Sequence, residues 1–268
     1  MPTPFYHINI AEDLLKHPGL ASNARRVLGQ YQCEFIFGHT APDVQVISGQ
    51  EREVTHFFIL PIQKGSPLPW ELILEANPSL RYFGQLPPAQ ASFLAGYLCH
   101  LQADWFWIRD VFAPIFGPTC SWGTFPERLY LHNVLRAYLD QQVYKTSPDG
   151  ISTCLCQVSP VHWLPFVEDH YLGEWQDFLT LQLQPGAVAQ TVEVFAARQG
   201  IEPDEFYHLI DSEERMDEEV FVHLPRQKLD RYRQSLVVEN LKLLRSSFEQ
   251  NYAVSQRTVR PLQTGKQV

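Results

Sequence analysis

Apolar residues recur with a helical period along most of the chain, and runs that alternate with a period of two are few. Proline and glycine mark several helix ends, such as Pro18-Gly19, Gly38 and Pro126. The segment 54–62 is apolar but too short for its periodicity to separate an extended from a helical conformation. We expect an all-α fold, a multi-helix bundle, with helices over residues 9–17, 22–37, 89–108, 126–144, 165–183, 187–199, 203–215 and 226–250.

With 268 residues, the chain is long enough for one large domain or for one domain with an appendage. We expect a helical domain over residues 1–185 and a helical extension over residues 186–268. The tail after Tyr252 is polar and is expected to fray. The pattern assigns no role to the extension.

The formal net charge of −9 argues against nucleic acid as the main partner, because phosphate backbones are bound by clustered Lys and Arg. The chain shows neither a signal peptide at its start nor a run of 18 apolar residues, so we expect no membrane span and a cytoplasmic location. Its five cysteines form no CxxC motif, and Cys154 and Cys156 are too close for a comfortable mutual disulfide. We therefore expect reduced, mostly buried thiols.

The segment AGYLCHLQADWFW, residues 95–107, places two ionisable side chains among apolar and aromatic residues. His100 and Asp104 are four residues apart, so a helix projects them from one face. Burying a carboxylate costs several kcal/mol unless a partner compensates it. A hydrogen bond between the two side chains is the commoner compensation, and a metal ion is the other. The aromatic residues of the segment suit core packing.

Other candidate ligands precede this segment. His39 and Asp43 lie on a loop that Pro42 stiffens, His56 precedes an apolar run, and His7 lies near the start of the first helical segment. Zinc accepts imidazole nitrogen and carboxylate oxygen, usually from several separate elements. Histidines spread over several apolar elements are what a metal site inside a helical bundle requires.

These four motifs, in this order, resemble the zinc-dependent phospholipase C superfamily of helical metallohydrolases, which includes fungal single-strand nucleases. The resemblance covers about the first half of the chain. It implies that Asp43, His56, His100 and Asp104 bind one zinc ion, and that Asp104 bridges to a further metal held also by His7. It also implies that Asp43 activates the attacking water. His39 is a candidate to support a ligand, or a loop histidine that caps the backbone.

The chain departs from the family pattern after Asp104. The family has another histidine there and then an HxxxE motif, whereas this chain has Asp110 and then His132 with Arg136 four residues later. Arginine does not ligate zinc. Asp110 with His132 is one candidate for a second metal cluster, and the HxxxE of His170 and Glu174 is another, unless it is a surface ion pair. The expected cofactor is one to three zinc ions.

The resemblance implies metal-assisted hydrolysis of a phosphodiester, either a phospholipid or a smaller ester. Two alternatives stay open. A helical protein that binds metal without catalysis would serve as an interaction partner, and the incomplete second cluster favours it. A phosphohydrolase of the HD type would need an adjacent His-Asp pair, and this chain has only Asp169-His170 in the reverse order.

Overall fold

The computed structural model describes residues 1–146, 150–184 and 189–257, and the side chains up to residue 249. Most of the described residues lie in helices and none of them lies in a strand, which confirms the all-α prediction. Short 3-10 helices lie at Ala41–Val44 (η1), Pro78–Leu80 (η2) and Phe83–Gln85 (η3), and π-helices at Ile108–Phe116 (η4) and Met216–Phe221 (η5). The α-helices are α1 (Pro4–Lys16), α2 (Ser22–Gln30), α3 (Gln32–Gly38), α4 (Gln45–Ser48), α5 (Arg52–His56), α6 (Pro69–Ala76), α7 (Pro88–Trp107), α8 (Phe125–Thr146), α9 (Ile151–Cys156), α10 (Asp169–Gln182), α11 (Thr191–Gln199), α12 (Pro203–Ile210), α13 (Glu213–Arg215) and α14 (Arg226–Arg257).

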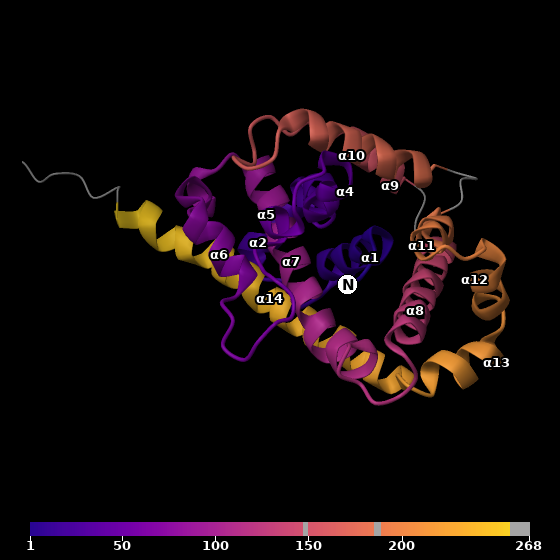
Figure 1. Ribbon diagram of the computed structural model, residues 1–268. Helices are drawn as coiled ribbons and strands as arrows, with labels where there is room; N and C mark the ends of the chain where they lie inside the picture. The colour runs from indigo at the N-terminus through magenta and orange to yellow at the C-terminus, as the bar shows by residue number, and fades with distance from the viewer. Residues whose placement is uncertain (147–149, 185–188, 258–268) are drawn as a thin grey trace, which may run out of the picture.

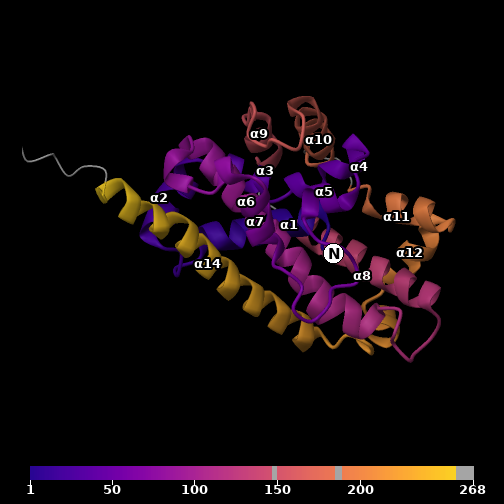
Figure 2. The same cartoon turned by 60° about the vertical axis from the view of Figure 1, so that its left-hand side comes forward.

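Helix α7 is the centre of the molecule (Figure 1). Every residue from Ala91 to Trp107 is buried, so this helix is covered on all sides. Helices α3, α6 and α14 pack against it, and α1 lies beside α3 and α8. Figure 2 shows α14 running along one side of the molecule. The two ionisable side chains of α7 therefore lie at the centre of the bundle.

Helix α14 packs against α1, α2 and α7, while α11 and α12 pack against α8. The elements after residue 189 therefore contact helices of the first half of the chain directly. The expected division between residues 185 and 186, and the start of the expected helix at 187, lie outside the described residues. The division into a domain and an extension stays a prediction.

Several helix bounds differ from expectation. Helix α1 begins at Pro4 rather than at residue 9, because Pro4 suits the first turn, so His7 lies inside the helix. The expected helix over 22–37 was wrong as one element. It breaks at Tyr31, whose backbone has φ −121° and ψ 47° and whose carbonyl accepts a hydrogen bond from Ser92 Oγ at 2.7 Å.

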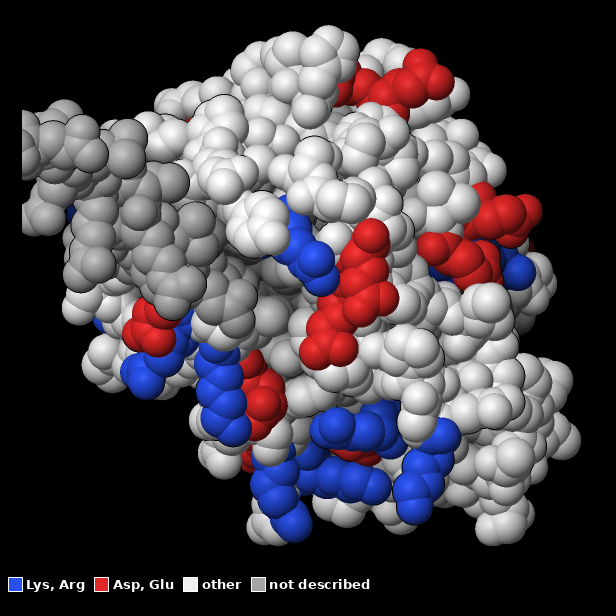
Figure 3. All heavy atoms as spheres, turned by 90° about the vertical axis from the view of Figure 1, so that its left-hand side faces the viewer, with Lys and Arg blue, Asp and Glu red and all other residues white. Residues whose placement is uncertain are grey.

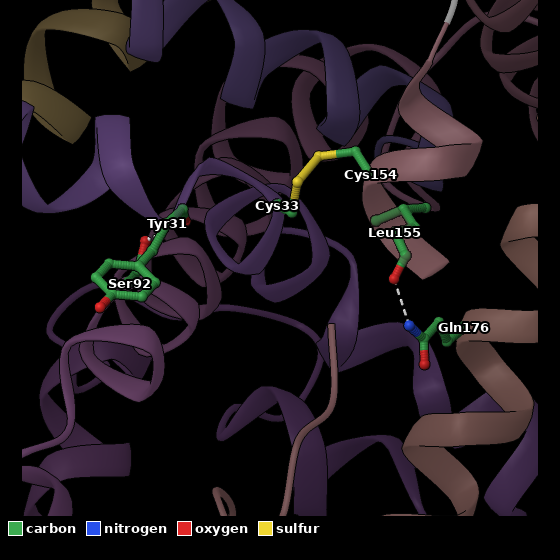
Figure 4. The surroundings of a disulfide bond; sticks show 6 residues. All are labelled: Tyr31, Cys33, Ser92, Cys154, Leu155 and Gln176. Carbon is green, nitrogen blue, oxygen red and sulfur yellow. Dashed lines mark hydrogen bonds between the residues drawn. A yellow bond between two sulfur atoms is a disulfide. The ribbon is translucent and has the colours of Figure 1, made fainter. Parts of the chain in front are cut away.

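The expectation of reduced, mostly buried thiols was wrong. Cys33 of α3 and Cys154 of α9 form a disulfide, with their Cα atoms 5.2 Å apart (Figure 4). These residues are 121 positions apart, and spacing alone does not reveal such a partner. Of the free cysteines, Cys99 is buried and Cys156 is exposed. The disulfide ties α9 to the helix that precedes the His39 loop.

Charged side chains of both signs lie on the surface. Figure 3 shows Lys and Arg gathered in the lower part of one face, with Asp and Glu between and above them. Several surface lysines and arginines pair within their own helix, as Lys242 does with Glu239 at 2.6 Å and Arg245 with Glu249 at 3.9 Å. In the part of the chain that the structure describes, no helix is long and apolar enough to cross a bilayer.

Candidate metal centre

Two glycines let helices α3 and α7 cross with their backbones almost in contact. A Cβ atom on Gly38 would lie 1.9 Å from the carbonyl oxygen of Phe93, and one on Gly96 would lie 2.1 Å from that of Phe35. Only glycine fits at such distances. His39 follows Gly38 directly, and His100 lies one turn after Gly96. The crossing therefore brings these two histidines together.

His100 and Asp104 project from one face of α7, as their spacing predicts, and meet His56 at the end of α5. Nε2 of His100 lies 3.7 Å from Asp104 Oδ2, and Nε2 of His56 lies 3.3 Å from the same oxygen. The two Nε2 atoms are 3.4 Å apart. All three side chains are buried, with at most 1% of their surface exposed. Three candidate ligand atoms thus surround one point in the core.

Hydrogen bonds fix which nitrogen of each imidazole faces this point. Nδ1 of His100 donates to the backbone carbonyl of His39 at 2.9 Å, because a carbonyl oxygen only accepts. Nδ1 of His56 lies 2.9 Å from Thr55 Oγ1, whose hydroxyl donates to the Arg52 carbonyl at 3.3 Å. His56 Nδ1 therefore carries the proton as well. In the neutral form of each imidazole, the Nε2 lone pair therefore faces the other Nε2 and a carboxylate, an arrangement that a proton or a metal cation stabilises.

Asp43 completes this group from the Pro42 loop, which forms the 3-10 helix η1. Its Oδ1 lies 3.5 Å from His56 Nε2, and 17% of its side chain is exposed. Asp43, His56 and His100 each offer a ligand atom, and these atoms lie within 4.8 Å of one another. Asp43 is therefore the ligand candidate at which the buried cluster meets solvent.

A second group lies on the other side of Asp104. His7 of α1 stacks on His100 with ring centroids 3.8 Å apart, and its Nε2 lies 3.4 Å from Asp104 Oδ1. His7, His39 and His100 also offer ligand atoms within 4.8 Å of one another. His100 has only its Nε2 free, so it can serve one ion. Asp104, with one oxygen toward each group, is positioned to bridge them.

Sequence reasoning missed Arg52. Its Nη2 donates to Asp104 Oδ2 at 2.6 Å, and its guanidinium lies over the ring of Phe58, 4.5 Å from the centroid. Arg52 and His56 are four residues apart on α5, so the same spacing argument that was used for His100 and Asp104 could have found it. The guanidinium partly neutralises the buried carboxylate.

Neighbouring charges set the protonation of the cluster. Burial would raise the pKa values of Asp43 and Asp104, but the surrounding histidines hold both below their ordinary range. Burial would lower the pKa of His100, but the carboxylates of Asp104 and Asp43 raise it. Burial and the neighbouring His100 lower the pKa of His7 to about 4. At neutral pH, ionised carboxylates thus face a neutral His7.

The unpartnered buried atoms fit a metal. Among the described residues, both ring nitrogens of His7, both ring nitrogens of His39, and Oδ1 of Asp104 are buried without a hydrogen-bond partner. Buried polar atoms are normally paired, and leaving one unpaired costs about 1–3 kcal/mol. Burial and the charges of His7 and His100 also lower the pKa of His39, which keeps its nitrogens available. The buried His/Asp cluster can hold a metal ion.

Asp110 and His132 do not join this cluster. Asp110 lies on the π-helix η4 and pairs with Arg109, with Nη2 and Oδ2 2.6 Å apart. Nε2 of His132 accepts a hydrogen bond from Trp107 Nε1 at 2.9 Å, so that lone pair is already used. Neither residue belongs to a group of candidate ligands among the described residues. Their pairing as a second metal cluster finds no support here.

His170 and Glu174 also lie apart from the cluster, on the outer helix α10. His170 pairs with Glu168, with Nδ1 and Oε2 3.4 Å apart, and 54% of its side chain is exposed. Glu174 is exposed. The interpretation of His170 as a surface histidine in an ion pair therefore fits, although its partner is Glu168.

Comparisons of the chain with protein-family models, with curated proteins and with solved structures found no match.

Proposed function

We propose that the protein is a zinc-dependent hydrolase of phosphodiester bonds. One observation carries the proposal: six candidate ligands from five segments of the chain converge on a buried cluster that reaches solvent at Asp43. The resemblance of the four motifs to the zinc-dependent phospholipase C superfamily supplies the expected reaction.

Asp43, His56, His100 and Asp104 would hold one ion, through the atoms that already face one another. The second oxygen of Asp104, with His7 and His39, would hold another. Imidazole nitrogen with carboxylate oxygen is a donor set that zinc accepts. A zinc ion bound there would lower the pKa of bound water toward about 7 and would neutralise charge on phosphoryl oxygens.

The residues at the opening have separate tasks. Asp43 is ionised at neutral pH, since the pKa of its carboxyl is lowered, and it can accept a proton from water at the solvent side. Nε and Nη1 of Arg52 have no hydrogen-bond partner among the described residues. These donors suit a phosphoryl oxygen, because a guanidinium binds such oxygens in a fixed geometry. Asp43 would therefore direct the attacking water, and Arg52 would orient the ester.

Metal analysis of the purified protein tests the binding step. We expect the wild type to carry zinc, and His100→Ala and Asp104→Ala each to lose it, since both side chains face the same point. His170→Ala is the matched control and should retain all the metal, because His170 lies on the surface. Full zinc occupancy in both cluster variants would refute the assignment.

A non-catalytic metal-binding protein that acts as an interaction partner is the second candidate function. Arg52 favours it, because this residue already binds the Asp104 oxygen that a metal would use. Assay of the zinc-loaded protein with methyl 4-nitrophenyl phosphate separates the two. Stoichiometric zinc with no hydrolysis above the zinc-free control would support the second candidate over the first.

A further inference from the structure

A cavity of about 150 Å³ adjoins the cluster. Asp43, which contributes to the cluster through its Oδ1, also lines this cavity, so the two share a wall. Trp175, Phe178 and Leu179 of α10 form one side, and Val194 and Phe195 of α11 form another. The side chains that line most of the cavity are apolar.

The lining of the cavity includes one arginine. Arg198, the exposed penultimate residue of α11, lines the cavity and makes no ion pair with any described residue. Arg136 lies nearby, with its guanidinium 4.4 Å from the centroid of Phe195. Its Nε is buried without a hydrogen-bond partner among the described residues. Arg198 is thus the arginine that lines this largely apolar cavity together with Asp43, whereas Arg136 contacts the lining residue Phe195 and is not itself part of the lining.

We propose that this cavity binds the apolar substituent of a phosphate ester whose phosphoryl group lies at the Asp43 side of the cluster, with Arg198 contacting a phosphoryl oxygen. The inference rests on the proposed function for the place of the phosphoryl group. It names the substrate class more narrowly: esters with one compact apolar group.

The size of the cavity limits that group. A space of about 150 Å³ is about the size that benzene fills. An aromatic ring or a short acyl chain is therefore of a size to fill it, whereas most of a long acyl chain of a membrane phospholipid would lie outside it. Of the two substrates that the sequence leaves open, the cavity favours the smaller ester. It also gives α11, which lies beyond residue 185, a direct role in substrate binding.

Calorimetric titration of the zinc-loaded protein with phenylphosphonate and methylphosphonate tests the inference. Both probes carry the same anionic group, and only the first has a ring for the cavity. We expect phenylphosphonate to bind at least about tenfold more tightly, because a single methylene in an apolar pocket already changes recognition by about tenfold or more. Equal affinities for the two probes would overturn the proposal, as would the absence of any binding.

Variants then locate the ring. Val194→Trp fills the cavity from α11 and should remove the preference for phenylphosphonate while methylphosphonate binds as before. Val46→Trp enters the cavity from α4, where Val46 is 52% exposed, and serves if the first variant does not fold. Val238→Trp, at a half-exposed position of α14 outside the cavity, is the matched control and should keep the preference. If both cavity variants still bound phenylphosphonate more tightly than methylphosphonate, the ring would bind outside this cavity.

Arg198→Gln should lower the affinity for both phosphonates by the same factor, since both carry the same anionic group. Unchanged affinities would remove Arg198 from the site. The same titrations separate this inference from the proposed function. Preferential binding without hydrolysis of methyl 4-nitrophenyl phosphate would retain the cavity and contradict the hydrolase. Hydrolysis of that ester with equal affinity for the two phosphonates would retain the hydrolase and contradict the role of the cavity.

Discussion

Asp104 shows how one buried carboxylate can have partners from several elements. Arg52 donates to its Oδ2, which also faces His56 and His100, while its Oδ1 faces His7. A lone buried carboxylate costs several kcal/mol, and the Arg52 guanidinium offsets part of that cost. Arg52 keeps 17% of its side chain exposed, although its Nε and Nη1 are buried. A metal ion at Asp104 Oδ2 would have to replace the guanidinium there.

Asp43→Asn tests the residue at the opening. The substitution keeps the shape of the side chain and removes the charge that binds metal and accepts a proton. We expect hydrolysis of methyl 4-nitrophenyl phosphate to fall by about 10²–10⁴-fold, the range for loss of a general base. The far-UV circular dichroism should stay native. Asp110→Asn is the matched control and should keep its rate, because Asp110 pairs with Arg109. An unchanged rate in Asp43→Asn would exclude this residue from the site.

Asp140 lies outside the cluster and links stability to pH. Burial raises the pKa of its carboxyl to about 7, although hydroxyl hydrogen bonds from Thr191 and Thr3 oppose the shift. The ordinary value is 3.8, so between about pH 4 and 7 the folded state binds more protons than the unfolded state. Stability from this group is therefore greatest below about pH 4 and falls as the pH rises toward 7.

In Asp140→Asn this contribution disappears. Relative to the wild type, the variant should gain free energy of unfolding as the pH rises from 4 to 7, by up to about 1.4 kcal/mol per pH unit. Urea unfolding of both proteins at pH 5 and pH 7 measures the difference, in which the titration of all other groups cancels. Parallel profiles for the two proteins would show that the pKa of Asp140 is not raised.

Among the elements, the crossing of α3 and α7 sets the geometry of the cluster. It brings the backbone carbonyl of His39 within hydrogen-bond distance of His100 Nδ1. Gly96→Ala should disrupt it, since the added Cβ would lie 2.1 Å from the Phe35 carbonyl oxygen and 2.7 Å from the His39 nitrogen. We expect a loss of about 1–3 kcal/mol in the free energy of unfolding, as for other overpacked sites, together with weaker zinc binding.

Gly173→Ala is the matched control for the crossing. Gly173 lies within α10, and a Cβ there would have no neighbour within 4 Å. Alanine favours a helix over glycine by about 0.5–1 kcal/mol, so this variant should be slightly more stable than the wild type. Denaturant unfolding measures the stability of both variants, and metal analysis measures their zinc content. If Gly96→Ala matched Gly173→Ala in both measurements, the close approach of α3 and α7 would not matter for the site.

Sequence patterns predict the local parts of this fold better than its long-range parts. Helix period and Pro positions located most helices, and the four-residue spacing of His100 and Asp104 placed both side chains on one buried face. By contrast, the pairing of Cys33 with Cys154 depends on how α3 and α9 pack, which no local pattern contains. The bond from Trp107 to His132 likewise uses a nitrogen that the sequence alone leaves free for metal.

At the scale of the whole molecule, a metal ion would join elements that are far apart in the chain. The candidate ligands come from α1, the C-terminal end of α3, η1, α5 and α7, and the chain between His7 and Asp104 must be folded before they meet. A ligand that binds only the folded state stabilises it in proportion to the logarithm of its concentration. Zinc binding and global stability should therefore rise together.

Thermal unfolding with and without zinc measures this coupling. With free zinc at about one hundred times its dissociation constant, we expect about 2.7 kcal/mol of added stability, which raises the melting temperature of a protein of this size by roughly 5–10 °C. Asp104→Ala should show no rise, because it removes the oxygens that face both groups of ligands. His7→Ala should retain part of the rise, since His7 belongs to only one group. A zinc-independent melting temperature in the wild type would contradict a site assembled by folding, and an equal rise in Asp104→Ala would place the zinc elsewhere.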